Sequence, residues 1–210
     1  MSISARDITG VILAGGLARR MGGVDKGLQP FLGQTLVEHA LSRLRPQVAT
    51  VGINANRHLD QYRAMGVAVW PDHNTHFEGP LAGFAAALSQ CNTPYLLTVP
   101  CDTPRFPLDL AARLGQALQE ANADIAMACA VEPQASGESQ IRSQPVFCLL
   151  RTSLLNSLNT FMQNGGRKID AWTAQHHTAL VSFDKPGDDP HGFFNINTLQ
   201  QLQSFATSQP

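Results

Sequence analysis

The N-terminal part of the chain reads Ile8-Thr9-Gly10-Val11-Ile12-Leu13-Ala14-Gly15-Gly16-Leu17-Ala18-Arg19-Arg20-Met21-Gly22-Gly23-Val24-Asp25-Lys26-Gly27. An apolar run of strand length, residues 8–14, is followed by a loop that holds five glycines and three cations. Short apolar runs of this kind alternate along the rest of the chain with segments of helical periodicity. That alternation is typical of a parallel sheet whose strands are joined by crossover helices.

We predict a three-layer, Rossmann-like α/β fold, in which a mostly parallel central sheet is flanked by helices. The apolar runs predict strands at 8–14, 48–53, 67–70, 95–99, 125–130, 146–150 and 179–183. An apolar stripe at helical spacing predicts a helix over 36–44, and similar patterns predict helices over 81–88, 108–118, 154–162 and 199–205. The polar stretches 132–143 and 184–191 are predicted as loops. In such a sheet ligands bind beyond the carboxyl ends of the strands.

Length and charge narrow the possible classes of protein. The 210 residues predict one domain over 1–210, and a net charge of -1 disfavours broad binding to nucleic acid or to acidic membranes. The four cysteines form no C-x-x-C pair, so we expect reduced core thiols. We find neither a leader peptide nor a membrane span and expect a cytoplasmic protein.

The glycine-rich loop has the composition of a triphosphate-binding site. Glycines let backbone N–H groups approach an anion, and arginine and lysine neutralise its charge. The loop lacks the G-x-G-x-x-G of dinucleotide enzymes, and Gly27 follows Lys26 where a P-loop requires Ser or Thr. The alternative is a flexible surface turn with incidental cations.

Four further motifs accompany this loop and carry a resemblance. They are Asn54-Ala55-Asn56-Arg57, Gly79-Pro80-Leu81-Ala82-Gly83, Pro100-Cys101-Asp102-Thr103-Pro104 and Asn195-Ile196-Asn197-Thr198. With Leu13-Ala14-Gly15-Gly16, Arg20-Met21-Gly22 and Asp25-Lys26-Gly27, they closely resemble the molybdenum cofactor guanylyltransferases, which have the nucleotide-diphospho-sugar transferase fold. The resemblance covers nearly the whole chain. It implies transfer of GMP from GTP to molybdenum-loaded molybdopterin, which yields the guanine dinucleotide cofactor and pyrophosphate.

The resemblance also implies roles for particular residues. Those expected to bind GTP are Leu13, Ala14, Gly15, Gly16, Gly23, Lys26, Asn54, Asp72 and Asp102. Lys26, Arg20 and Asp102 are the expected catalytic residues. A phosphate nucleophile is already ionised at neutral pH, so in-line attack on the α-phosphorus needs no general base.

Asp102 is the predicted magnesium ligand. It follows an apolar strand and lies between Pro100 and Pro104, which prevent the strand from continuing. One carboxylate is enough, since Mg²⁺ takes its other ligands from water and phosphate. The alternative is an aspartate that caps the following helix.

Asn54 and Asp72 follow two neighbouring predicted strands and are expected at the same edge of the sheet. A carboxylate can accept hydrogen bonds from the N1–H and N2–H of guanine, and an amide suits a ribose hydroxyl. Both residues can equally be ordinary turn residues.

Six residues are candidates for binding the acceptor substrate: Gly79, Gly83, Arg167, Lys168, Asn195 and Asn197. Each has a structural alternative. Gly83 can serve packing inside its helix, the two cations can follow a helix C-terminal glycine, and the two asparagines can cap the helix near Thr198. In the wider fold the region of Asn195 can supply a second carboxylate to the metal, but here it carries amides, so a second protein ligand is in doubt.

Other enzymes and other classes of protein remain open. They are a cytidylyltransferase acting on molybdopterin, a sugar-1-phosphate nucleotidyltransferase and a non-catalytic guanine-nucleotide sensor. We expect a monomer that makes transient contact with proteins of molybdenum insertion or molybdoenzyme maturation. The segment 132–143 is expected to close over the acceptor. His73, His76, His176 and His177 lack a third ligand at recognisable spacing and are expected to be surface or packed residues.

Overall fold

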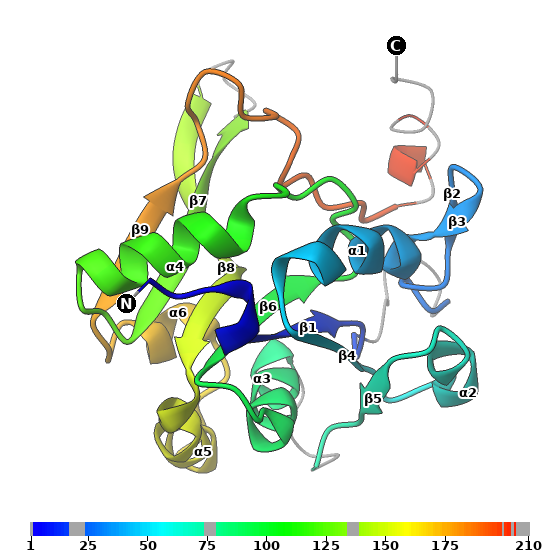
Figure 1. Ribbon diagram of the computed structural model, residues 1–210. Helices are drawn as coiled ribbons and strands as arrows, with labels where there is room; N and C mark the ends of the chain where they lie inside the picture. The colour runs from blue at the N-terminus through cyan, green and yellow to red at the C-terminus, as the bar shows by residue number, and fades with distance from the viewer. Residues whose placement is uncertain are drawn as a thin grey trace.

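The computed structural model describes residues 2–16, 24–73, 79–133, 139–198, 200–202 and 204 (Figure 1). The strands are β1 (Ile8–Leu13), β2 (Pro30–Phe31), β3 (Gln34–Thr35), β4 (Thr50–Asn54), β5 (Ala68–Trp70), β6 (Tyr95–Pro100), β7 (Ile125–Pro133), β8 (Ser139–Arg151) and β9 (Thr178–Ser182). The α-helices are α1 (Leu36–Leu44), α2 (Leu59–Arg63), α3 (Pro80–Gln90), α4 (Leu110–Glu120), α5 (Leu155–Gln163) and α6 (Ile169–Thr173). Short 3-10 helices span Ala5–Asp7, Arg45–Gln47 and Thr152–Leu154.

Seven strands form the central sheet in the order β5-β4-β1-β6-β8-β7-β9. The pairs β4–β5, β1–β4, β1–β6 and β7–β9 are parallel, whereas β8 runs antiparallel to both β6 and β7. The chain leaves β1 toward β4 and β5 and then returns to the other side of β1 with β6. This reversal of direction makes the carboxyl end of β1 the topological switch point, where a ligand crevice is expected in an open α/β sheet.

Helices cover both faces of the sheet, which confirms the predicted three-layer α/β fold. One apolar core joins alternate residues of β1, β6 and β7 to α1, α2 and α4. The second core lies on the opposite face and joins the intervening strand residues to α3, α5 and α6. Figure 1 shows α1 and α4 on one side of the sheet and α3 and α5 on the other.

Helix α1 begins directly after the short β2–β3 hairpin. Thr35 and Glu38 form a capping box at its start, and the hydrogen bonds from Thr35 lower the pKa of the Glu38 carboxyl group. The predicted apolar stripe is confirmed, because all five of its side chains are buried: Leu36, Val37, Ala40, Leu41 and Leu44. The cap therefore fixes where α1 starts, and the stripe fixes which face meets the sheet.

The prediction of a loop over 132–143 was wrong, since most of that segment belongs to the β7–β8 hairpin. The pairing extends to Val131 with Ile141 and, further out, to Pro133 with Ser139. The described side chains of 140–143 are exposed, so they carry no apolar alternation that would have predicted a strand. Backbone hydrogen bonds to β7 hold β8 in place there. The β7–β8 hairpin therefore occupies most of the segment that we expected to close over the acceptor.

Other differences concern ends and short elements. Strand β4 ends on Asn54, one residue later than predicted, and α4 begins after Leu108, which is 60% exposed. The short elements β2, β3, α2 and α6 were not predicted, since two to five residues show no periodicity. Of the helix predicted over 199–205, residues 200–202 and 204 are described and are helical.

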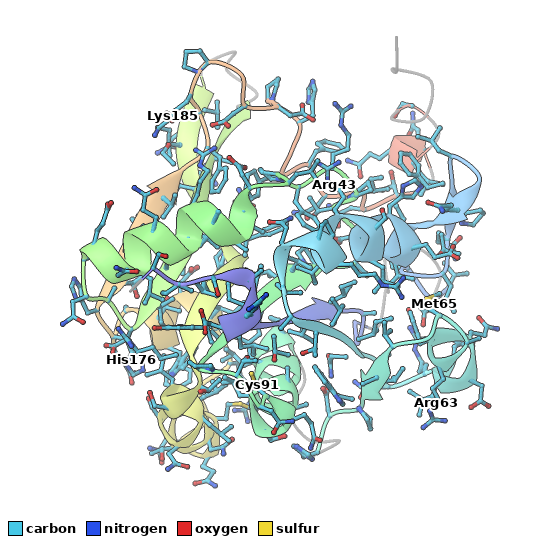
Figure 2. The ribbon with its side chains drawn as sticks, viewed as in Figure 1. Arg43, Arg63, Met65, Cys91, His176 and Lys185 are labelled. Carbon is cyan, nitrogen blue, oxygen red and sulfur yellow. The ribbon has the colours of Figure 1, made fainter. Side chains whose placement is uncertain are left out.

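The thiols agree with the sequence prediction. All four cysteines are free, and three of them are buried. Cys91, labelled in Figure 2, lies between α3 and β6, and its sulfur contacts the Tyr95 carbonyl oxygen. Within the described parts of the chain we found no helix that combines the length and the apolar character needed to cross a membrane.

Leu44 tests the core between α1 and the sheet. Its side chain is fully buried and lies directly over the backbone of Gly10 in β1. We expect Leu44→Ala to lower the free energy of unfolding by about 2–5 kcal/mol in urea denaturation, because the cavity would be only partly filled by relaxation.

Leu180→Ala is the matched control for this experiment. The Leu180 side chain is 65% exposed on β9, so its truncation should change the free energy of unfolding by less than about 0.5 kcal/mol. Equal effects of the two substitutions would contradict the assigned core.

Candidate active site

Several of the predicted site residues meet at the carboxyl edge of the parallel strands. Backbone hydrogen bonds continue past the strand ends: Ala14 N donates to Asn54 O at 2.8 Å, and Cys101 N donates to Leu13 O at 3.1 Å. The segments that follow β1, β4 and β6 therefore stay side by side at the switch point. Asp102 lies two residues beyond the end of β6, which brings it to the same edge.

Lys26 lies at the centre of this edge. Its ammonium group donates to Asp102 Oδ2, with which it forms an ion pair, and to Asn197 Oδ1 at 2.9 Å. The side chains of Lys26 and Asp102 are each 17% exposed. A cation from the segment between β1 and β2 and a carboxylate from the segment after β6 thus meet within a partly enclosed site, where electrostatic interactions are stronger than in water.

Asp102 does not cap the next helix, so that alternative is excluded. Helix α4 begins at Leu110, and Asp109 is its N-cap residue. The Asp102 backbone is instead tied to the C-terminal segment, since Ile196 N donates to Asp102 O at 2.9 Å. This hydrogen bond brings residues 195–197 to the edge that the loops after β1 and β6 form.

The side chain of Asn197 also belongs to this edge rather than to a helix cap. Its Oδ1 accepts from Lys26, whereas the hydroxyl of Thr198 accepts from Gln201 N at 3.1 Å and caps the C-terminal helical turn. Asn195 Oδ1 accepts a hydrogen bond from the hydroxyl group of Thr103. The structure therefore brings both predicted asparagines to Lys26 and to the neighbour of Asp102.

Asn54 is the buried last residue of β4 and not a turn residue, and its side chain links β4 to Trp70 and Asp72. Its side-chain amide donates to Trp70 O at 2.9 Å and to Asp72 Oδ1 at 2.8 Å, and the residue is 3% exposed. The amide oxygen lies 3.0 Å from the position that a Cβ on Gly15 would take, and a Cβ on Gly83 would collide with it. Gly15 thus allows the segment after β1 to approach Asn54, and Gly83 allows α3 to do so. Gly83 therefore has a packing role.

Asp72 is held by a second asparagine that the sequence analysis did not single out. Asn56 donates to Asp72 Oδ2 at 2.8 Å and accepts from Asp72 N at 2.8 Å. With Asn54 on Oδ1, each carboxylate oxygen receives one amide hydrogen bond and keeps lone pairs for further donors. The residue spacing Asn54-x-Asn56 at the end of a strand was the available signal.

The candidates at 165–168 are divided between two roles. The Arg167 guanidinium donates to Met162 O at 2.9 Å and to Gly166 O at 2.7 Å, so it caps the C-terminal end of α5. Lys168 is the exposed N-cap residue of α6. Gly79 precedes α3 with φ of 124°, and a Cβ there would lie 3.9 Å from Arg167 O. The start of α3 and the 165–168 segment are therefore neighbours.

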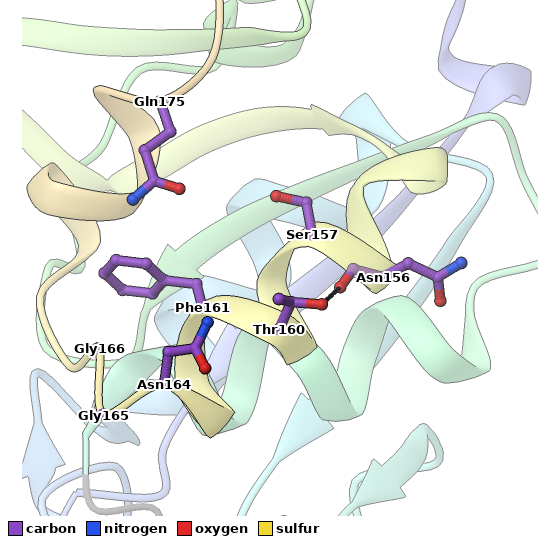
Figure 3. A pocket seen from close by; sticks show the side chains of 8 residues that line it. All are labelled: Asn156, Ser157, Thr160, Phe161, Asn164, Gly165, Gly166 and Gln175. Carbon is purple, nitrogen blue, oxygen red and sulfur yellow. Dashed lines mark hydrogen bonds between the residues drawn. The ribbon is translucent and has the colours of Figure 1, made fainter.

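A hollow of about 690 Å³ lies beside α5, on the face of the sheet that α3 also covers (Figure 3). Amide, hydroxyl and aromatic side chains line it together with two glycines: Asn156, Ser157, Thr160, Phe161, Asn164, Gly165, Gly166 and Gln175. None of these residues carries a charge. A triphosphate requires cations, so the hollow does not correspond to the site around Lys26.

Two further residues were missed by the sequence analysis. Asp25 is 7% exposed, and the fully buried Tyr62 donates its hydroxyl proton to Asp25 Oδ1. Burial and the neighbouring Asp25 raise the pKa of Tyr62 far above its ordinary value. Burial, reinforced by the charge of Asp102, likewise raises the pKa of the Cys101 thiol. Asp25 resembles an ordinary loop residue in the sequence.

The predicted residues Arg20 and Gly23 lie outside the described parts of the chain, as does His76. Gly16 is described, and its carbonyl oxygen accepts from Arg57 at 3.2 Å. The other histidines behave as expected: His176, labelled in Figure 2, bonds to Ser157 Oγ at 2.9 Å, and His73 bonds to Ser89 Oγ. Among the described residues, no three His, Cys, Asp or Glu side chains are grouped so that they could hold a metal ion.

Comparison with known proteins identifies the family of this fold and site. Residues 10–179 match the family described as the MobA-like NTP transferase domain. A curated relative from Acidovorax ebreus, named molybdenum cofactor guanylyltransferase, is 61% identical over 203 residues, which cover 96% of each chain. A relative of the same name from Albidiferax ferrireducens is 58% identical and covers 95% of this chain and 96% of its own.

Solved structures share the fold at low sequence identity. Molybdopterin-guanine dinucleotide biosynthesis protein A from Archaeoglobus fulgidus superimposes with a TM-score of 0.74 at 19% identity, covering 95% of this chain and 97% of that one. A CMP:2-keto-3-deoxy-manno-octonic acid synthetase reaches 0.70 at 13% identity, with 97% and 98% coverage. The chain belongs to the MobA-like NTP transferase family and, within it, to the molybdenum cofactor guanylyltransferases.

Proposed function

We propose that this enzyme transfers GMP from GTP to molybdenum-loaded molybdopterin and that Lys26 and Asp102 are its central catalytic residues. The observation that supports these roles is the meeting of the Lys26 ammonium with the Asp102 carboxylate at the switch point of the sheet. The family supplies the reaction class, and the site supplies the charges that the reaction needs.

The reaction exchanges one phosphoanhydride bond for another. A phosphate oxygen of the acceptor forms a bond to the α-phosphorus of GTP, the bond from that phosphorus to the bridging oxygen breaks, and pyrophosphate leaves with the electron pair. Both nucleophile and leaving group are anions, so the protein must hold them in line and neutralise their charge. Lys26 supplies a cation at the site, and the glycine content of the loop that follows β1 suits it to bind phosphate oxygens through backbone N–H groups.

Asp102 fits the role of a magnesium ligand. A single partly exposed carboxylate, with no preformed group of three ligands among the described residues, suits an ion that takes its remaining ligands from phosphates and water. Magnesium bound there would supply positive charge to the phosphate oxygens. The Lys26 ammonium compensates the charge of the Asp102 carboxylate through their ion pair.

Base recognition is assigned to Asp72. Asn54 and Asn56 fix both carboxylate oxygens at the edge of the sheet, where they can accept the N1–H and N2–H of guanine. Neither donor is matched by cytosine or adenine in the same geometry. Asn54 itself is too buried to be a main contact of the base and serves to hold Asp72.

The acceptor is assigned to the side of the sheet edge formed by Asn195 and Asn197, next to the segment that follows β6. The Arg167 backbone lies next to Gly79 at the start of α3, and Gly79, Arg167 and the adjoining Lys168 are a second acceptor contact in this proposal. Contacts with molybdenum-insertion or maturation proteins, a monomeric state, a cytoplasmic location and a single domain over 1–210 stay predictions.

The first test is pyrophosphate release by the purified protein with magnesium, loaded molybdopterin and one nucleoside triphosphate at a time. We expect release with GTP and none with CTP, ATP or UTP, and no release when the acceptor is omitted. Release with CTP would move the assignment to cytidylyl transfer. Tight GTP binding without release would favour a nucleotide sensor.

The roles of Lys26 and Asp102 are tested by Lys26→Ala and Asp102→Asn. Each variant should fold and lose about 100-fold or more of kcat, since each removes a charge that stabilises the transition state. Lys185→Ala and Asp60→Asn are the matched controls, because both side chains are exposed elsewhere on the surface. A folded Lys26 or Asp102 variant with the rate of the wild type would refute that role.

The role of Asp72 is tested by Asp72→Asn. The amide lacks one of the two acceptor oxygens, so kcat/KM for GTP should fall by about 10-fold to 100-fold while catalysis with saturating GTP changes less. Asp60→Asn again serves as the control. An unchanged preference for GTP over the other triphosphates would place base recognition elsewhere.

A further inference from the structure

The Asp25 carboxyl group is buried beside the site but does not touch the Lys26–Asp102 pair. It is 7% exposed, and its Oδ1 accepts from the hydroxyl of Tyr62 and from Gly27 N at 3.1 Å. Tyr62 comes from α2, whose neighbouring residues Asp60 and Gln61 are exposed. A short surface helix thus sends one aromatic side chain inward to reach a carboxyl group.

The backbone around Lys26 is held on both sides by this arrangement. Asp25 O accepts from the Gln29 side chain at 2.8 Å, Lys26 O accepts from Gln29 N at 3.2 Å, and Gly27 O accepts from Val37 N at 2.9 Å. Residues 25–27 are therefore fixed to the start of α1 and to Tyr62. The backbone of this segment is fixed, and the Lys26 side chain extends from it to Asp102.

Gly27 shows how closely the parts approach each other. A Cβ on Gly27 would lie 2.6 Å from the Tyr62 hydroxyl oxygen and 3.5 Å from Cys101 Cβ. The backbone on the C-terminal side of Lys26 is thus in contact with Tyr62 and with the residue that precedes Asp102. A small displacement at Tyr62 would change the separation of Lys26 from Asp102.

We propose that Asp25 and Tyr62 are positioning residues that fix the backbone of 25–27 and so aim the Lys26 ammonium at the reacting phosphates. This inference rests on the catalytic role of Lys26 proposed above. A buried polar pair is not the least costly way to fill a core, since apolar side chains of similar volume are often as stable or more so. The pair does what apolar packing cannot, because its hydrogen bonds fix the orientation of the Gly27 amide.

The test is Tyr62→Phe, which removes the hydroxyl and keeps the ring. We expect a folded protein whose kcat falls by about 10-fold, because small errors in the position of a catalytic group are costly. The KM for GTP should change by less than about 3-fold. In a Lys26→Ala background, read in single-turnover experiments, Tyr62→Phe should cost less than about 2-fold, since the residue acts through Lys26.

Tyr95→Phe is the matched control, because Tyr62 and Tyr95 are the two tyrosines of the chain. Tyr95 is the first residue of β6 and lies at the amino end of that strand, away from the site. Loss of its hydroxyl group should therefore leave kcat unchanged. A wild-type kcat for Tyr62→Phe would overturn the inference. An equal loss in the wild-type and Lys26→Ala backgrounds would overturn it too, since Tyr62 would then act independently of Lys26.

A second measurement is independent of turnover. The chain has three lysines, at positions 26, 168 and 185, so the side-chain CH₂ signals next to their ammonium groups can be resolved by NMR and assigned by substitution. Tyr62→Phe should shift the Lys26 signal toward that of an exposed lysine and leave the other two in place. An unmoved Lys26 signal would overturn the positioning role, whereas absent transferase activity with a shifted signal would refute only the proposed function.

Discussion

Hydrogen bonds from β1 to β4 on one side and to β6 on the other align the carboxyl ends of three strands, with adjacent strands about 5 Å apart. Parallel pairing has this effect only because all three strands point the same way. The ladder continues beyond the strands through Ala14 and Cys101, so the first loop residues are also aligned. Residues that are far apart in the sequence can then meet without any long side chain having to bridge them.

The polar groups at this edge form two separate sets, one partly exposed and one buried. Outside, Lys26 pairs with Asp102 and Asn197, and these groups remain partly exposed. Inside, Asp25 and Tyr62 are bound to one another and to the backbone, where no solvent can replace them. Asn54 plays the corresponding role on the other side of β1, because its amide connects β4 to Asp72. The partly exposed charges and the buried polar pair are therefore held by different hydrogen-bond networks.

The sequence predicted the central sheet because its strands depend on local apolar patterns. The apolar run 8–14 gave β1 almost to the residue, and proline and glycine placement singled out Asp102 and the β1 loop. Burial of polar residues was not predictable in the same way. Asp and Asn are residue types common in turns, so the burial of Asp25 and Asn54 could not be predicted from their identity. They are buried because α2 and α3 pack over them. The outer part of β8 over 140–143 was not predicted for the opposite reason, since backbone pairing with β7 maintains it although its side chains are exposed.

The partners of Lys26 also have a consequence for how the protein is made. The hydrogen bond from Lys26 to Asn197 spans 171 residues of sequence, and that to Asp102 spans 76. Contacts of such separation form only after the intervening chain has been synthesised and folded. A nascent chain that has just passed β6 can already pair the lysine with the aspartate, but it lacks the amide that completes the arrangement. The site is therefore finished only after Asn197 has left the ribosome, so a chain truncated before that residue carries Lys26 without its full set of partners.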